Sequence, residues 1–406
     1  MATDNKNKVL NVPHLRFPEY TGEWDEHALS EYLDFKNGLN PDANRIGHGL
    51  PFISVMDILS DGVINYDNIR SKVEATEKEI ECFGVQNGDI LFQRSSETLE
   101  DVGRANVYMD NRTAIYGGFV IRGRKIGNYN PLFFKYLLAT PLARKRTCRM
   151  GAGAQHFNIG QERLSKISLF FPSLEEQKKI ASLLELLDER IAFQSKIIEK
   201  QQSLIKGIVD KLMTVLLKGE LYPFSSFYIK AGEGGTPTTS KNEYYSGGTI
   251  PFIKIDDLSC KYLTSNKDFI TELGMQKSSA WLIPSQSVIY SNGATIGAIS
   301  INEYPVCTKQ GILGIVPNTN VNVEYLFLLM SSSYFSKGVS RIITEGTMKT
   351  AYLKDINHIK CPLPSMAQQK SITNLTSSIE EKLYVEQKIL KFLNLQKQHL
   401  LRTVFI

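Results

Sequence analysis

The chain has 406 residues, of which 42% are hydrophobic and 22% are charged, and its formal net charge is +5. This length suits two or three domains and exceeds one typical hydrophobic core. The small positive charge permits contact with nucleic acid without indicating it. Five scattered cysteines without a Cys-x-x-Cys pair argue against a disulfide framework and a structural zinc site. The polar beginning and the lack of a long apolar run predict a cytoplasmic protein without a membrane span.

The sequence contains one pattern twice. Residues 172–177 read PSLEEQ and residues 364–369 read PSMAQQ, so the offset is 192 residues (364 minus 172). Earlier in each half, the tripeptide PFI occurs at 51–53 and again at 251–253. A tandem repeat of this size predicts two similar modules. We expect a first module over 1–172, a helix over 173–218, a second module over 219–364 and a helix over 365–406.

Short apolar runs between turn-like segments predict strands inside each module. In the first module these runs are residues 90–92 and 118–121, and in the second they are 288–290 and 312–316. Asn130 and Asn322 each precede an apolar segment and are predicted to cap a short helix. Grouped strands with a few short helices indicate an α+β fold of two mixed, strand-rich modules in tandem.

A heptad pattern follows each module and predicts two long helices of the coiled-coil type. Polar residues such as Gln194 and Glu386 interrupt each apolar seam. Two such helices in one chain should pack on each other, in parallel or antiparallel orientation, although each seam could instead dock on its own module. The seam includes Leu184, Ile191, Ile198, Ile205 and Leu212 in the first helix, and Leu383, Leu390 and Leu400 in the second.

Motifs of catalytic sites are missing from the sequence. There is no GxxxxGK[ST] phosphate loop, no GxGxxG after a strand, no HExxH pair and no GxSxG turn. The six histidines are isolated, so we expect no metal site. The sequence therefore predicts a protein without catalytic activity and without a bound cofactor.

Polar side chains of the types that contact DNA gather in loops of both modules. Arg and Lys neutralise phosphates, and Arg, Lys, Asn and Gln also read base edges. A polar, glycine-containing loop stands shortly before each long helix, at residues 151–158 and 345–352. For any single basic residue, a solvated surface charge is the simpler explanation, but the pairing of the loops favours a shared role. The candidate DNA contacts are Arg94, Ser95, Arg104, Arg146, Gln155, His156, Thr236, Thr238, Lys241, Asn292, Lys309, Gln310, Thr347 and Lys349.

Taken together, these features resemble the specificity (S) subunit of type I restriction-modification systems. The resemblance rests on the opening residues 12–24, on GGTP at 234–237 followed by GTIPFI at 248–253, on GDILF at 88–92, and on the two repeated helix openings. It covers essentially the whole chain. The first module departs from it with NGLNP at 37–41 in place of GGTP, and the second has SQSV at 285–288 in place of the Gly-Asp-Ile turn.

The resemblance implies a non-catalytic subunit that reads a bipartite, asymmetric site in double-stranded DNA, one half per target recognition domain. It further implies that the two long helices form an antiparallel coiled coil, which sets the half-site spacing and docks two methyltransferase (M) subunits. S-adenosylmethionine for adenine methylation, and the ATP and magnesium used by restriction (R) subunits, would then be held by those partners. The alternatives are a coiled-coil scaffold with two protein-binding modules and, less favoured by the missing motifs, a nuclease or methyltransferase with an unrecognised site.

Overall fold

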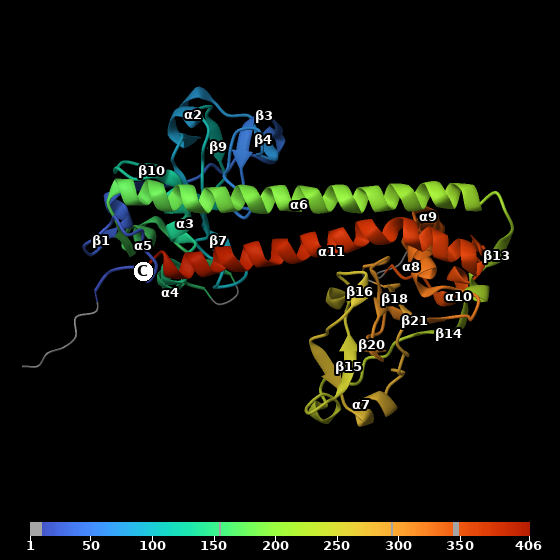
Figure 1. Ribbon diagram of the computed structural model, residues 1–406. Coiled ribbons are helices and arrows are strands. Elements are labelled where there is room, and N and C mark those ends of the chain that lie inside the picture. Colours follow the sequence, from blue (N-terminus) through green and yellow to red (C-terminus); the bar gives the residue numbers. More distant parts are fainter. Residues whose placement is uncertain (1–9, 154–155, 294, 344–348) are drawn as a thin grey trace, which may run out of the picture. The chain divides into compact units, whose positions relative to one another are not determined.

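The computed structural model describes residues 10–153, 156–293, 295–343 and 349–406 (Figure 1). The chain forms two compact units, Met1–Ser195 together with Lys388–Ile406, and Lys196–Gln387. Two long helices, α6 (Leu174–Leu216) and α11 (Met366–Thr403), each contribute residues to both units. Among the described residues, no helix is both long enough and apolar enough to cross a membrane.

The first unit holds small sheets and short helices. Its main sheet has the order β2-β10-β6-β8, a second sheet has the order β4-β3-β9-β5, and β1-β12 and β11-β7 form pairs. The strands are β1 (Asp25–Ala28), β2 (Leu33–Asn37), β3 (Ile46–Ile53), β4 (Ser71–Val73), β5 (Gly84–Val85), β6 (Ile90–Gln93), β7 (Ser95–Ser96), β8 (Ala105–Val107), β9 (Ala114–Tyr116), β10 (Val120–Lys125), β11 (Phe157–Asn158) and β12 (Ser168–Phe171). The helices are α1 (Val55–Ile58), α2 (Glu77–Phe83), α3 (Pro131–Leu138), α4 (Pro141–Met150) and α5 (Gln161–Ser165).

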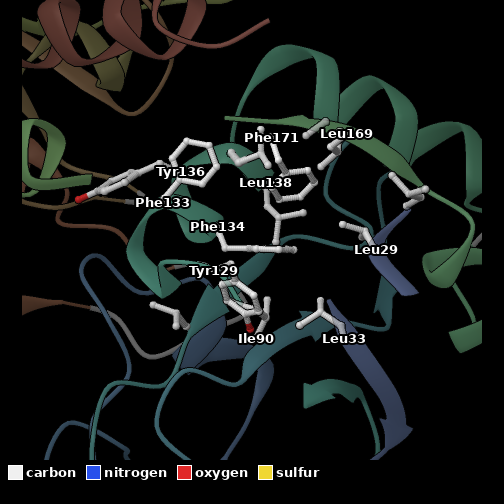
Figure 2. Close-up of a cluster of buried hydrophobic side chains, with 14 of the residues drawn as sticks. Leu29, Leu33, Ile90, Tyr129, Phe133, Phe134, Tyr136, Leu138, Leu169 and Phe171 are labelled. Carbon is white, nitrogen blue, oxygen red and sulfur yellow. The ribbon is translucent and has the colours of Figure 1, made fainter. Parts of the chain in front are cut away.

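An aromatic core joins this module to the long helices. Phe133 and Phe134 of α3 pack with Tyr129 and Phe171, as Figure 2 shows. The same core takes in apolar side chains from the beginning of α6 and from the residues that directly follow α11, namely Ile180, Ala181, Leu184, Val404 and Phe405. Burial of these side chains fixes the first module on both helices.

The second unit repeats this architecture. Its sheets have the orders β14-β21-β18-β19-β16, β17-β15-β20 and β13-β22. The strands are β13 (Leu221–Pro223), β14 (Tyr228–Glu233), β15 (Ile250–Ile253), β16 (Tyr262–Leu263), β17 (Asp268–Ile270), β18 (Val288–Ser291), β19 (Ile299–Asn302), β20 (Cys307–Thr308), β21 (Ile312–Pro317) and β22 (Lys360–Pro362). The helices are α7 (Glu272–Gln276), α8 (Val323–Ser331), α9 (Ser333–Ile342) and α10 (Leu353–Ile356).

Equivalent pairings identify equivalent elements in the two modules. The parallel pair β3 and β9 aligns Phe52 with Ile115, and the parallel pair β15 and β20 aligns Phe252 with Cys307. The order β2-β10-β6-β8 likewise corresponds to β14-β21-β18-β19. The α+β fold of two strand-rich modules in tandem is confirmed. Strand β10 begins at Val120, however, so the expected strand over 118–121 starts two residues late, and Phe119 lies outside it.

The two long helices pair in antiparallel orientation inside each unit. In the first unit, Asp188 of α6 forms an ion pair with Lys397 of α11 over 2.5 Å. In the second unit, Val209 and Met213 near the end of α6 share a core with Ile372 near the beginning of α11. The prediction that the helices pack on each other is confirmed, and both helices also pack on the modules. Over 43 residues, α6 reaches roughly 65 Å at 1.5 Å per residue.

Candidate nucleic-acid interface

Three segments of the first module meet at Arg94, directly after β6. The backbone N–H of Arg94 donates to the carbonyl of Phe119 over 2.9 Å, and its own carbonyl accepts from the N–H of Ile159 over 3.0 Å. Next to it, Ser95 hydrogen-bonds the side chain of Asn158, where β7 pairs with β11. The predicted contacts Arg94 and Ser95 are therefore brought next to the polar loop that precedes α6.

The same junction recurs in the second module at Asn292. Its backbone N–H donates to the carbonyl of Gly311 over 3.0 Å, and its carbonyl accepts from the N–H of Ala351 over 2.9 Å. Its side-chain Nδ2 also donates to the carbonyl of Ala351 over 3.1 Å. Only 1% of Asn292 is exposed, so its side chain has no accessible surface that could contact DNA. Its hydrogen bonds instead fix the backbone at Ala351. The prediction of a direct DNA contact at Asn292 is corrected accordingly.

A glycine-containing loop completes each junction. In the first module the N–H of Gly38 donates to Val120, and a Cβ on Gly38 would lie 2.1 Å from the carbonyl oxygen of Gly117. In the second module the N–H of Gly234 donates to Ile312, and a Cβ there would lie 2.1 Å from the carbonyl oxygen of Thr308. Only glycine permits this close approach. NGLNP and GGTP therefore occupy the same structural position despite their different sequences.

The loop that follows the parallel strand β9 in the first module, and β20 in the second, carries different side chains in the two modules. The second module carries the exposed residues Lys309 and Gln310 there, and the N–H of Gln310 donates to Oγ1 of Thr236 over 3.3 Å. At the equivalent positions, 192 residues earlier, the first module has Gly117 and Gly118. Phe119 follows them and is 67% exposed. The shared framework thus presents a basic and an amide side chain in the second module and an aromatic ring in the first.

Sequence reasoning missed Phe119, because its neighbours Val120 and Ile121 suggested a buried strand. The signal that could have found it is the repeat itself, which aligns residues 117–119 with residues 309–311. Exposed aromatic rings can stack on unpaired bases or contact thymine methyl groups. Phe119 therefore joins the candidate contacts of the first module.

Two of the predicted basic residues are engaged within the protein. Arg146 forms an ion pair with Glu26 over 2.6 Å and hydrogen-bonds the carbonyl of Ser168, so its guanidinium ties α4 to the β1-β12 pair. Arg104 forms an ion pair with Asp101 over 2.7 Å, yet about half of its side chain is exposed. Arg146 thus has a structural role, whereas Arg104 retains a surface from which to reach a phosphate.

The remaining described candidates lie at the surface. Lys241 donates to the hydroxyl of Tyr244 over 3.3 Å, and this hydrogen bond raises the pKa of the ammonium group. Lys241 is exposed and, like any solvated lysine, positively charged at neutral pH, so it is suited to a phosphate. Thr238, His156 and Lys349 are exposed in loops. Gln155 and Thr347 lie outside the described residues, and these two predictions stay predictions.

The predicted partner-binding positions of the long helices face inward. Leu184 and Ile198 are buried, and Ile191, Ile205, Leu212, Leu383, Leu390 and Leu400 are half-buried. This burial follows from the antiparallel pairing, in which the seam packs within the chain, and a direct partner contact by these side chains stays a prediction. The apolar residues that the helices do expose are Leu186, Phe193, Leu204 and Val215 on α6, and Leu375, Tyr384, Val385, Phe392 and Leu395 on α11.

Across the described parts of the chain, no group of three or more His, Cys, Asp or Glu side chains could hold a metal ion. What the junctions offer chemically is hydrogen-bond donors, amides and positive charge on a rigid backbone. Those are the groups from which proteins build contacts with phosphates and base edges.

The chain belongs to the family described as "Type I restriction modification DNA specificity domain". The model of this family matches residues 21–201 and 229–395, which correspond to the two tandem modules and much of their helices. The resemblance inferred from the sequence is thereby confirmed.

Relatives described as type I restriction enzyme specificity subunits match nearly the whole chain or part of it. The putative type I restriction enzyme MjaX specificity subunit of Methanocaldococcus jannaschii is 24% identical over 408 residues, covering 94% of this chain and 92% of the relative. The EcoR124I/EcoR124II specificity subunit of Escherichia coli is 27% identical over 161 residues, covering 37% of this chain and 40% of that protein. The crystal structure of the S subunit of a type I restriction-modification system from M. genitalium superposes with a TM-score of 0.56 at 17% identity, covering 97% of this chain and 99% of that one. At this identity the last similarity establishes the fold.

Proposed function

We propose that the chain is the specificity subunit of a type I restriction-modification complex and reads an asymmetric, two-part site in double-stranded DNA. Each module would read one half of the site, through the loops that meet at Arg94 in one case and at Asn292 in the other. The protein itself would have no catalytic activity.

The observation that carries this proposal is the pair of junctions. Their backbone hydrogen bonds are the same, from Arg94 to Phe119 and Ile159, and from Asn292 to Gly311 and Ala351. Their exposed side chains differ, with Phe119 in one module and Lys309 and Gln310 in the other. A constant framework with variable surface residues suits two readers of different base sequences.

The proposed partners are two methyltransferase subunits, which would hold S-adenosylmethionine, and restriction subunits that would use ATP and magnesium. A solved structure whose title describes complex assembly of the type I system shares the fold, with a TM-score of 0.53 at 14% identity. Because the target is chromosomal or invading DNA, we further propose that the chain acts in the cytoplasm. The relatives give no support to the alternative of a protein-binding scaffold.

Mapping of methylated adenines tests this proposal. The chain and its methyltransferase subunit are expressed together in a host that lacks adenine methylation, and the genome is sequenced by a method that detects N6-methyladenine. The proposal predicts one motif made of two defined halves separated by a spacer of unspecified bases. A continuous motif, or methylation by the methyltransferase without this chain, would contradict it.

A further inference from the structure

A cavity of about 830 Å³ lies in the second unit, between the recognition module and both long helices. Ile205 and Val209 of α6, Phe327 and Leu328 of α8, and Tyr384 of α11 give it apolar walls. This volume is within the range of pockets that bury a compact ligand or a cluster of inserted side chains. Part of the wall is open surface, because Tyr384 is about half exposed.

The charged groups of the cavity are mostly acidic. Lys261 is 14% exposed and forms ion pairs with both Glu324 and Glu380. One ammonium group between two carboxylates leaves a surplus negative charge in a partly desolvated place, where it attracts a cation more strongly than it would in water. Burial, together with the hydrogen bond and charge of Glu324, raises the pKa of Tyr262, so this phenol stays neutral.

Two further carboxylates add to the surplus of negative charge in the cavity. Glu303 and Glu381 line the cavity and are exposed, and Lys206 is the other lysine that lines it. Four acidic and two basic side chains give a net charge of −2 (2 minus 4). Such a surface repels DNA phosphates, so this cavity is distinct in chemistry from the candidate nucleic-acid interface.

At the equivalent positions, the first unit has a lysine in place of an apolar ring and keeps the acidic residue. The counterpart of Phe327, 192 residues earlier, is Lys135, whose ammonium group donates to the carbonyl of Gly62 over 2.6 Å. The counterpart of Glu380 is Asp188, which is paired with Lys397 and accepts from the hydroxyl of Tyr136 over 3.0 Å. The first unit thus supplies its own cations where the second unit has an apolar and acidic cavity.

We propose that this cavity of the second unit binds a basic, partly apolar segment of a partner polypeptide. Lys or Arg side chains of the segment would meet Glu303 and Glu381, and its apolar side chains would pack on Phe327 and Tyr384. The inference rests on the proposed function, since the partner would be a subunit of the same complex. It adds that the two ends of the helical pair are not equivalent for that partner.

A native cysteine reports on the cavity. Cys260 lines it and is exposed, whereas Cys82 and Cys148 of the first unit are half-buried and Cys307 and Cys361 are buried. N-ethylmaleimide alkylation of each cysteine is followed by mass spectrometry in the free chain and in the complex with its methyltransferase subunit. The proposal predicts that assembly slows alkylation of Cys260 at least tenfold, with Cys82 as the internal reference.

Reversing the charge of two cavity residues tests whether the partner binds in this cavity or at another surface. In Glu303→Lys/Glu381→Lys, we expect Cys260 to be alkylated in the presence of the partner at the rate of the free chain. The control, Glu220→Lys/Glu272→Lys, reverses two exposed carboxylates of the same unit outside the cavity and should retain the protection. Thermal unfolding of each variant verifies that it is folded.

Each outcome decides the proposal. An assembled complex that leaves Cys260 unprotected, or protection that survives the charge reversal, overturns it while leaving the proposed function intact. Equal protection by spermidine alone would assign the cavity to a small cation and also overturn it. If the wild-type chain forms no complex with a methyltransferase subunit, the proposed function and this proposal are both overturned.

Discussion

The backbone N–H of Asn130 donates to Oε1 of Gln177 over 3.0 Å, and this hydrogen bond ties the start of α3 to the start of α6. The other end of the Gln177 side chain donates to the carbonyl of Pro172 over 3.0 Å. The second module repeats the connection, with Asn322 donating to Gln369 over 2.7 Å. The repeated glutamine therefore fixes each long helix on the module that precedes it, which explains its place in both helix openings.

Replacing this glutamine in either module should lower the free energy of unfolding. Gln177 is 3% exposed, so Gln177→Leu leaves a buried amide N–H and a carbonyl without their partners. We expect a loss of about 1–3 kcal/mol in the free energy of unfolding, and the same for Gln369→Leu. Urea denaturation measures both. Gln396→Leu on the exposed face of α11 is the matched control, and a loss as small as the control's in both variants would contradict the assignment.

A buried ion pair anchors the N-terminal segment to α6. Arg16 makes two hydrogen bonds of 2.8 Å to Glu176, whose side chain is 2% exposed, and this contact raises the pKa of Arg16. Arg16→Met should cost about 3–5 kcal/mol because it leaves a buried carboxylate unpaired. Glu176→Gln should restore much of this loss in the same chain, since the second module has Gln368 at the equivalent position. Thermal and urea denaturation of the four chains of this cycle give the coupling energy, and additive losses would argue against the pair.

The exposed loop of the second junction should determine one half-site. Gln310→Ala removes an amide that can read a base edge, and we expect relaxed sequence preference in one half of the methylated motif. Lys309→Ala should instead lower affinity for all sequences and reduce the slope of log affinity against log salt by about one. Phe119→Ala in the first module serves as the counterpart and should alter the other half-site. Changes in both halves from Gln310→Ala alone would contradict a separate reading by each module.

Burial of Lys135 predicts a measurable dependence of stability on pH. Burial lowers the pKa of this lysine to about 8, with nearby Asp188 opposing the shift. Between pH 8 and the unfolded pKa near 10.4, the unfolded chain binds more protons than the folded one, so stability rises with pH. From pH 7 to 9.5, the wild type should gain on the order of 2 kcal/mol relative to Lys135→Met. Urea denaturation at several pH values tests this, and parallel curves for the two chains would refute it.

The repeat and the heptads were sufficient to predict the tandem modules, the long helices and their pairing, because both features depend on spacing along the chain. Asn130 and Asn322 were recognised as helix caps for the same reason, and both side chains accept from the third residue of their helix. The burial of Asn292 and the engagement of Arg146 depend on partners far away in sequence, Ala351 and Glu26, which no local pattern specifies. The heptads by themselves allowed either orientation of the helices, and the antiparallel orientation that the resemblance implied is confirmed by the ion pair of Asp188 with Lys397.

The long helices offer the most direct test of the account. Both pass from one unit to the other, α6 after Ser195 and α11 after Gln387. Duplicating residues 189–195 and 381–387 adds one heptad to each helix at these points and preserves the seam. Seven residues add roughly 10 Å at 1.5 Å per residue, or about three base pairs of B-DNA.

Adenine methylation is then mapped in cells that carry this lengthened chain and the methyltransferase subunit. The account predicts the same two half-site sequences as in the wild type, separated by a spacer about three base pairs longer. Unchanged spacing, or an altered half-site, would contradict the proposal that each module reads its own half-site and that the long helices set the spacer.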